Sequence, residues 1–193
     1  MAEIIGIIGA MEEEVSTLIP ALEDHTERRI GIVTYHVGKL DGKEVVVARS
    51  GVGKVNAALT AAEMIRTFHA TVIVNTGVAG ALDESLEPED AVIATALVQH
   101  DYSTAPLGDP PGRVSGIDLV YIPADPAISV AAENAARELG VRRVLTGTIA
   151  SGDQFISDPA RKEWIRRTFG VLPARWRGRR SRTPVPCTAS AAP

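Results

Sequence analysis

Short apolar runs alternate with amphipathic stretches through the first 170 residues. Residues 3–9, 71–74, 90–98 and 144–150 are compact apolar segments, which is typical of buried strands. Strands and helices interleave without internal repeats, which predicts a three-layered α/β fold with ligand-binding loops at the strand ends. The other predicted elements are helices at 11–22, 55–68, 127–139 and 158–169, strands at 30–37 and 44–50, and a loop at 102–123.

The amino-acid composition is that of a globular protein. Among 193 residues, 45% are apolar and only 4% are aromatic, so the core has to rest on aliphatic side chains. There is no run of about 18 apolar residues, and no membrane-spanning segment is expected. The N-terminus lacks the basic region of a signal peptide, and the single Cys187 cannot form an intramolecular disulfide. These features predict a cytoplasmic protein.

The net charge of −4 is unevenly distributed along the chain. Residues 171–193 contain five Arg and no Asp or Glu, whereas the 15 basic and 24 acidic residues before them give a charge of −9. The expected organisation is therefore a domain at 1–170 followed by a disordered, Arg/Pro-rich tail at 171–193. Such a tail can bind nucleic acid nonspecifically, but the acidic domain would repel the same partner, which disfavours that function.

Two glycine-rich segments resemble nucleotide-binding motifs without meeting their requirements. Gly51–Lys54 would need a Gly at Ala48 and a hydroxyl residue at Val55 to form a phosphate-binding loop. The segment 6–9 lacks the G-x-G-x-x-G spacing of a dinucleotide fold. Both nucleotide-binding classes are disfavoured.

Three acidic residues, 12–14, follow the first predicted strand and its Gly turn. The ordinary interpretation is a solvated first helical turn, where carboxylates are favoured by the helix dipole. The alternative is that one carboxylate at this strand end faces a ligand and acts as a general base toward water. Position alone leaves both open.

Two polar or small-residue loops, 75–80 and 151–156, also follow predicted strands. The first is either a tight turn or a place where a flat nucleoside approaches the backbone. In the second, Phe155 is either buried in the core or stacks on a purine. His36, His69 and His100 show no metal-ligand spacing with one another or with Cys187, so no metal is expected.

Four motifs together resemble one enzyme family. GIIGAMEEEV at 6–15 is similar to the opening of the 5′-methylthioadenosine/S-adenosylhomocysteine nucleosidases, and SGVGKVNAA, VNTGVAGAL and ASGDQFI follow at 50–58, 74–82 and 150–156 in that family's order. The resemblance covers residues 3–170. It implies a phosphorylase/hydrolase-like α/β/α fold with a central twisted mixed sheet, a small nucleoside substrate, no cofactor and a homodimer.

The resemblance also implies a mechanism, hydrolysis of the N-glycosidic bond that releases adenine. Glu14 corresponds to the carboxylate that orients and deprotonates the attacking water. An Asp protonates N7 of adenine, and a Met-Glu pair holds the ribose hydroxyls. A phosphorylase of the same fold is the rival hypothesis; it would need Arg residues for phosphate, and Arg49 is a candidate.

The substrate-binding residues implied by the resemblance surround the nucleoside. Val52 corresponds to the apolar residue beside the ribose, and 78–80 to the backbone along the purine. Phe155 corresponds to the ring under adenine and Ile156 to the residue whose backbone binds its edge. The full set is Val52, Val78, Ala79, Gly80, Thr104, Leu107, Phe155 and Ile156. The loop with Thr104 and Leu107 closes the partner's thioalkyl pocket in the family dimer.

After Gly170 the chain departs from the family pattern. The family continues with a strand carrying Glu-Met-Glu and then a helix, whereas residues 172–182 read LPARWRGRRSR. Codons for this segment can be chosen so that another frame reads Ala-Gly-Glu-Met-Glu-Gly-Ala-Ala-Ile-Ala-His, which is the missing family segment. A frameshift near residue 171 is therefore the favoured explanation. It implies a fold without its last strands and closing helix, and an inactive chain without the Met-Glu pair and the proton-donating Asp.

Overall fold

The computed structural model describes residues 3–83, 85–175 and 185–191. These residues form two compact units, and each is considered by itself. The first extends to Gly77 and includes residues 190–191, and the second comprises Val78–Ala189. Strand β5 (Val72–Ala81) contributes its first half to one unit and its second half to the other.

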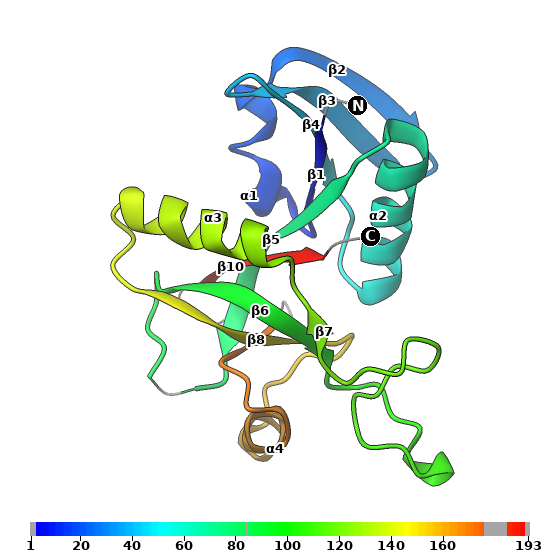
Figure 1. Ribbon diagram of the computed structural model, residues 1–193, viewed down its shortest axis with the longest axis vertical. Helices are drawn as coiled ribbons and strands as arrows, with labels where there is room; N and C mark the ends of the chain where they lie inside the picture. Colours follow the sequence, from blue (N-terminus) through cyan, green and yellow to red (C-terminus); the bar gives the residue numbers. More distant parts are fainter. Residues whose placement is uncertain (1–2, 84, 176–184, 192–193) are drawn as a thin grey trace. The chain divides into compact units, whose positions relative to one another are not determined.

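The first unit contains a mixed sheet (Figure 1). Its strands follow the order β5-β1-β4-β3-β2, in which β1 is parallel to both β4 and β5 and the last three strands are antiparallel. The elements are β1 (Ile4–Gly9), α1 (Glu12–Val15), the 3-10 turn η1 (Ile19–Ala21), β2 (Glu23–Ile30), β3 (Val33–Leu40), β4 (Lys43–Arg49) and α2 (Lys54–Phe68).

Strand alternation in β4 explains the three layers of this unit. Val46 packs in a cluster with Met64 of α2, whereas Val45 and Val47 pack in another with Val15 of α1. Because neighbouring strand residues point to opposite faces, one apolar run packs against α2 on one face of the sheet and α1 on the other. Gly6 lets α2 approach closely: a Cβ atom there would lie 2.8 Å from the sulfur of Met64.

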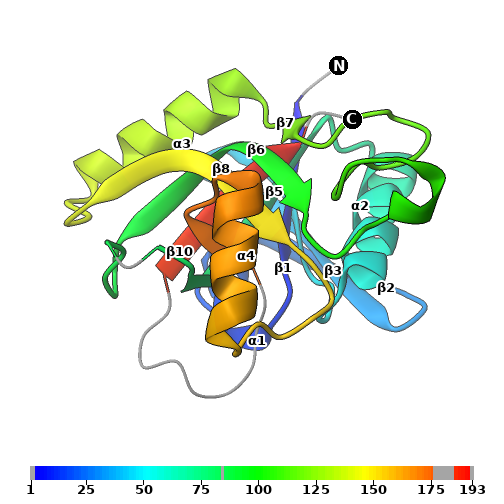
Figure 2. The same ribbon diagram turned by 90° about the horizontal axis from the view of Figure 1, so that it is seen from below.

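The second unit is built around β8. This strand is parallel to β6 and β9, β10 is parallel to β6, and β9 is antiparallel to the second half of β5. Helices α3 and α4 lie on opposite faces of β6 and β8 (Figures 1 and 2). The elements are β6 (Ala91–Gln99), η2 (Ala105–Leu107), β7 (Ile122–Pro123), α3 (Pro126–Glu138), β8 (Val144–Ser151), α4 (Pro159–Phe169), β9 (Pro173–Arg175) and β10 (Val185–Ala191).

The α/β class predicted from the sequence is confirmed, and helices α2, α3 and α4 lie within a residue of their predicted bounds. The predicted helix at 11–22 is wrong beyond Val15, because Pro20 replaces a regular helix with a 3-10 turn. The predicted loop at 75–80 is part of strand β5. Within the part of the chain described here, no helix is long and apolar enough to cross a membrane.

The C-terminal segment differs from the disordered tail expected at 171–193. Residues 173–175 and 185–191 form strands, and 176–184 lie outside the described residues. Pairing with neighbouring strands explains the difference, since the backbone groups of β5, β6 and β8 can pair with an extended segment of almost any sequence. The end of the described chain is therefore part of a sheet, although its sequence carries no family motif.

Candidate functional site

Glu14 is distinguished from its two acidic neighbours by its surroundings. Its Oε2 atom accepts hydrogen bonds from the backbone N–H groups of Ala10 and Met11, at 2.6 and 3.0 Å. Glu14 is half-buried, whereas Glu12 and Glu13 are exposed. The structure therefore fixes one carboxylate of the three at the carboxyl end of β1, where hydrogen bonds from two amides stabilise its negative charge.

The absence of a side chain at Gly9 leaves room for Glu14 in this position. A Cβ atom at residue 9 would lie 2.9 Å from Cβ of Glu14 and 2.7 Å from Cγ1 of Val15. The backbone N–H of the buried Ser50 donates to the carbonyl of Gly9 at 2.9 Å, which ties the end of β1 to the end of β4. A larger residue at position 9 would push α1 away and move Glu14.

Arg49, the candidate phosphate ligand of the rival hypothesis, pairs with an acid instead. Its Nη1 atom lies 3.5 Å from Oε2 of Glu12, and both side chains are exposed. Exposed ion pairs of this kind stabilise a protein by about 0–1 kcal/mol. The contact is weak, but it places a carboxylate, rather than a second cation, beside Arg49.

Val52 lies in the loop between β4 and α2 and is 47% exposed. The side-chain amide of Asn56 donates to the carbonyl of Val52 at 2.7 Å, which holds the loop in place. Gly51 and Gly53 have φ angles of 82° and 111°, which favour glycine. Val52 therefore presents an apolar side chain from a well-anchored loop, as a ligand contact requires.

The predicted purine-binding stretch lies in β5. Ala79 is buried in a cluster with Ala94 and Ile149, whereas Val78 and Gly80 are partly buried. Since the Ala79 side chain belongs to the core, any ligand contact by this residue has to use its backbone.

Phe155 and Ile156 follow β8 and behave differently from each other. Ile156 packs against a buried cluster that includes Ala150, Ile165 and Phe169. Phe155 is 47% exposed, so the alternative that its ring is buried in the core is wrong. Of the two side chains, that of Phe155 is the more exposed.

The loop that carries Phe155 is anchored by residues that were not among the predicted site residues. Asp101 accepts a hydrogen bond at Oδ2 from the backbone N–H of Asp153 at 2.7 Å, and the N–H of His100 donates to the carbonyl of Ser151 at 3.0 Å. His100 is 1% exposed, and a Cβ atom at Gly152 would lie 2.3 Å from its Nε2. Gly152, within the motif ASGDQFI, was the one sequence signal of this packing.

Thr104 precedes the 3-10 turn η2, and Leu107 is its last residue. Thr104 donates from Oγ1 to Oδ2 of Asp109 at 2.6 Å, and Asp109 in turn pairs with Arg113 at 3.2 Å. Leu107 is 82% exposed. Leu107 is thus accessible to another molecule, while the hydroxyl of Thr104 holds its own loop together.

The predicted site residues are divided between the two units. Glu14 and Val52 belong to the first unit, and the other seven belong to the second.

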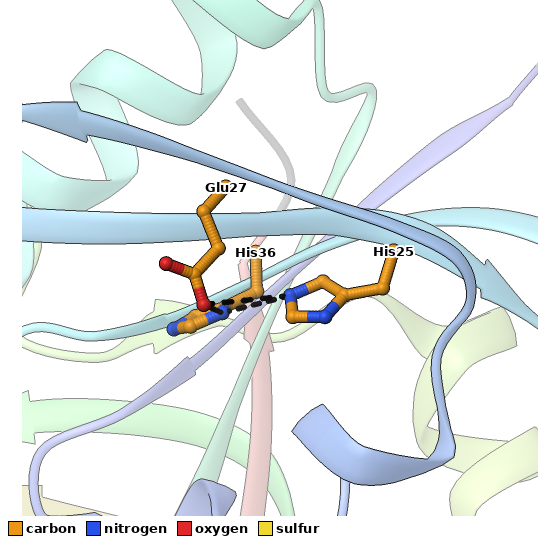
Figure 3. Close-up of side chains that lie close together, drawn as sticks. All are labelled: His25, Glu27 and His36. Atoms are coloured by element: carbon orange, nitrogen blue, oxygen red, sulfur yellow. Dashed lines mark hydrogen bonds and ion pairs between the residues drawn. The ribbon is translucent and has the colours of Figure 1, made fainter.

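One cluster of potential metal ligands lies among the described residues, and sequence spacing missed it. His25, Glu27 and His36 each offer a ligand atom, and these atoms lie within 4.8 Å of one another (Figure 3). The residues come from two strands, and Glu27 is paired directly with His36 in the β2–β3 register. A search restricted to neighbouring positions along the chain cannot find such a set.

Comparison with known proteins places this geometry in a family. A model of the phosphorylase superfamily matches residues 4–173. The chain is 41% identical over 168 residues to a 5′-methylthioadenosine/S-adenosylhomocysteine nucleosidase of Anoxybacillus flavithermus, covering 87% of this chain and 72% of the relative. It is 40% identical to an aminodeoxyfutalosine nucleosidase of Campylobacter jejuni, covering 86% and 72%.

Solved structures agree with this assignment. The structure of a 5′-methylthioadenosine/S-adenosylhomocysteine nucleosidase from Neisseria meningitidis in complex with methylthio-immucillin-A is similar, with a TM-score of 0.87 and 32% sequence identity, over 96% of this chain and 84% of that one. A Campylobacter jejuni nucleosidase gives a TM-score of 0.86 at 36% identity, over 99% and 85%. The chain therefore belongs to the phosphorylase superfamily and, within it, to the 5′-methylthioadenosine/S-adenosylhomocysteine nucleosidases.

Proposed function

We propose that this fold serves to hydrolyse the N-glycosidic bond of 5′-methylthioadenosine and S-adenosylhomocysteine, with Glu14 as the group that activates water. The observation that carries the proposal is the carboxylate of Glu14, held at the end of β1 by two backbone amides. Water adds to C1′ of the sugar as the bond to N9 of adenine breaks, and the electron pair of that bond leaves with adenine, which the Asp of the family mechanism protonates at N7. The proton lost by the water passes to the carboxylate.

Orientation is what the two amides contribute to this reaction. A general base has to lie within hydrogen-bonding distance of the water that it deprotonates, and a freely rotating side chain meets that condition only part of the time. Because Ala10 and Met11 hold Oε2, the position of this carboxylate oxygen is restrained before substrate binds. Glu12 and Glu13 are exposed, and the contact described for Glu12 is the ion pair of 3.5 Å with the exposed Arg49.

The adenine end of the substrate is assigned to the second unit. The exposed ring of Phe155 offers a stacking surface, which is worth about 0.5–1.5 kcal/mol beyond the area that it buries. The backbones of Ile156 and of 78–80 supply hydrogen bonds to the purine edge in this assignment. Val52 contacts the ribose, and the exposed Leu107, with Thr104, closes the thioalkyl pocket of a second subunit. The enzyme acts in the cytoplasm.

The 193-residue chain itself is proposed to be inactive. Residues 172–182 do not contain the Met-Glu pair that would hold the ribose, and β9 and β10 occupy sheet positions with an unrelated sequence. Positioning of this kind controls catalytic rate strongly, since even small misplacements of the reacting groups slow a reaction by about 10²-fold. The fold is therefore that of the enzyme, whereas the ribose site is incomplete.

A comparison of two proteins tests both parts of the proposal. One is the chain as it stands, and the other has residues 172–182 replaced by Ala-Gly-Glu-Met-Glu-Gly-Ala-Ala-Ile-Ala-His and continues in that reading frame. Adenine release from 5′-methylthioadenosine is followed with and without phosphate. We expect phosphate-independent release from the second protein only. Release that requires phosphate would show a phosphorylase, and rapid release by the unaltered chain would overturn the proposed inactivity.

A further inference from the structure

The β2–β3 hairpin of the first unit brings together two imidazoles and a carboxylate. His25 Nε2 lies 3.0 Å from His36 Nδ1, Glu27 Oε1 lies 3.4 Å from His36 Nδ1, and Glu27 Oε1 lies 3.9 Å from His25 Nε2. Figure 3 shows the polar ends of the three side chains converging from the two strands. We propose that these three residues bind a divalent transition-metal ion, with Zn²⁺ as the best match.

The spacing of the three donor atoms suits zinc. A circle through them has a radius of about 2.0 Å, and zinc–nitrogen and zinc–oxygen bonds in proteins are about 2.0–2.2 Å long. An ion at the centre of the triangle therefore contacts all three atoms without a change of backbone. Shifts of a few tenths of an ångström in the side chains would raise it toward a tetrahedral position.

The chemistry of the donors selects the metal class. Neutral imidazole suits Zn²⁺, Cu²⁺ and Ni²⁺, whereas Ca²⁺ and Mg²⁺ require mostly oxygen ligands. Glu27 supplies one negative charge, which partly neutralises a divalent ion. The neighbouring Arg28 lies over the ring of Phe68 of α2 at 5.7 Å, and alternation along β2 puts it on the opposite face of the hairpin from Glu27.

The hairpin also holds the three side chains in place and leaves them accessible to solvent. Glu27 and His36 are direct partners in the antiparallel register, and His25 lies in β2 at the register shift between Glu23 and Thr26, where its Nε2 is 3.0 Å from His36 Nδ1. The His25 and His36 side chains are 31% and 15% exposed, and Glu27 is 59% exposed. Glu27 and His36 also line a pocket of about 350 Å³ with Glu12 and Arg49. Since a water molecule takes about 30 Å³, water can complete the coordination.

Without a metal, the same contacts would be a hydrogen-bonded pair of histidines beside a carboxylate. At 3.0 Å one imidazole has to donate to the other. In the metal-bound form both nitrogens instead direct lone pairs at the ion. The metal-site interpretation therefore predicts that these residues bind added zinc, whereas the interpretation as a hydrogen-bonded pair predicts that they do not.

The test is a titration of the purified, untagged 193-residue protein with Zn²⁺, followed by isothermal calorimetry and by the imidazole NMR signals. We expect saturable binding of one ion per chain, with shifts confined to His25 and His36. Glu27→Gln changes an exposed side chain and should weaken binding by at least about tenfold, because even outer-shell partners of a metal ligand contribute 10- to 100-fold. His25→Gln with His36→Gln should abolish it.

Two control variants separate this site from adventitious binding. His69→Asn replaces an exposed histidine at a φ of 57°, which Asn tolerates, and Cys187→Ser removes the thiol. Both should bind Zn²⁺ as the parent does. The proposal is overturned if the parent shows no saturable 1:1 binding, if binding survives the double histidine substitution, or if it is lost in either control variant.

Discussion

The loop after β8 offers a quantitative test of the packing that positions Phe155. In Gly152→Ala, the new methyl group would lie 2.3 Å from Nε2 and 2.6 Å from Cε1 of His100, and 3.0 Å from Cγ of Asp101. No positive φ is involved at this residue, so the backbone tolerates Ala and the cost comes from the clash alone. The ring of His100 is 1% exposed and has little room to move.

Overpacking of this kind costs about 1–3 kcal/mol and sometimes more. Since each kcal/mol lowers the melting temperature by about 2–4 °C in a chain of this size, we expect a decrease of several degrees. Gly147→Ala, within β8 itself, is the matched control. Its methyl group would meet only the flexible end of Leu172, at 3.0 Å, so its effect should be below about 1 kcal/mol.

The assay is urea denaturation of the parent, both variants, His100→Ala and the double variant Gly152→Ala/His100→Ala. The double variant removes the obstructing ring, so the two effects should be non-additive by about 1 kcal/mol or more. Equal stability of the Gly152→Ala and Gly147→Ala variants would refute the reasoning. Strict additivity in the double variant would refute it as well, because the clash would then have another source.

Three further predictions concern single side chains. In the protein whose residues 172–182 are replaced by the family segment, Glu14→Gln keeps an oxygen that can accept hydrogen bonds from the Ala10 and Met11 amides but removes the base. The rate of adenine release should therefore fall by about 10²–10⁴-fold at unchanged melting temperature. A smaller loss would contradict the role of Glu14. Phe155→Ala should weaken adenine binding about 2- to 13-fold in the same protein, by calorimetry, with Phe155→Trp close to the parent; unchanged affinity would refute the stacking. Hydrogen bonds from Ser85 lower the pKa of Asp83 in the folded protein. The ionised carboxylate therefore stabilises the fold at a pH above the pKa of Asp83 in the unfolded chain. This stabilisation is lost as the pH falls through the lower pKa of Asp83 in the folded protein. Ser85→Ala should raise the pKa of Asp83 in an NMR titration, and an unchanged pKa would disprove the assignment.

The sequence was informative where periodicity and packing coincide. Helices α2, α3 and α4 and strands β1, β6 and β8 were predicted because their apolar spacing reflects the face that they bury. Strand β2 was missed, since seven of its eight residues are exposed and its pattern carries no apolar alternation. The small residues at 75–80 were expected to form a loop, although they continue strand β5, where Gly80 pairs with β9 and the Ala79 side chain packs in the core.

Only part of the candidate site could be predicted, because several of its contacts join residues that the sequence pattern does not link. Motif resemblance selected Glu14 from three adjacent acids, and the amide contacts that single it out are visible only in the structure. The cluster of His25, Glu27 and His36 depends on pairing between strands, which becomes predictable only after the hairpin register is known. The packing of His100 against Gly152 joins residues 52 positions apart, and spacing along the chain carries no signal for it.

The polar character of β2 also bears on self-association. This strand lies at the edge of its sheet, where unpaired backbone groups would otherwise accept a strand from another molecule. Its sequence, EDHTERRI, places charges of both signs along an almost fully exposed ribbon. A second copy of β2 laid alongside it in parallel and in register, as in a fibre, would bring like charges together and strip them of water. The charged residues that made β2 hard to recognise as a strand therefore disfavour the addition of further copies of the strand at this edge.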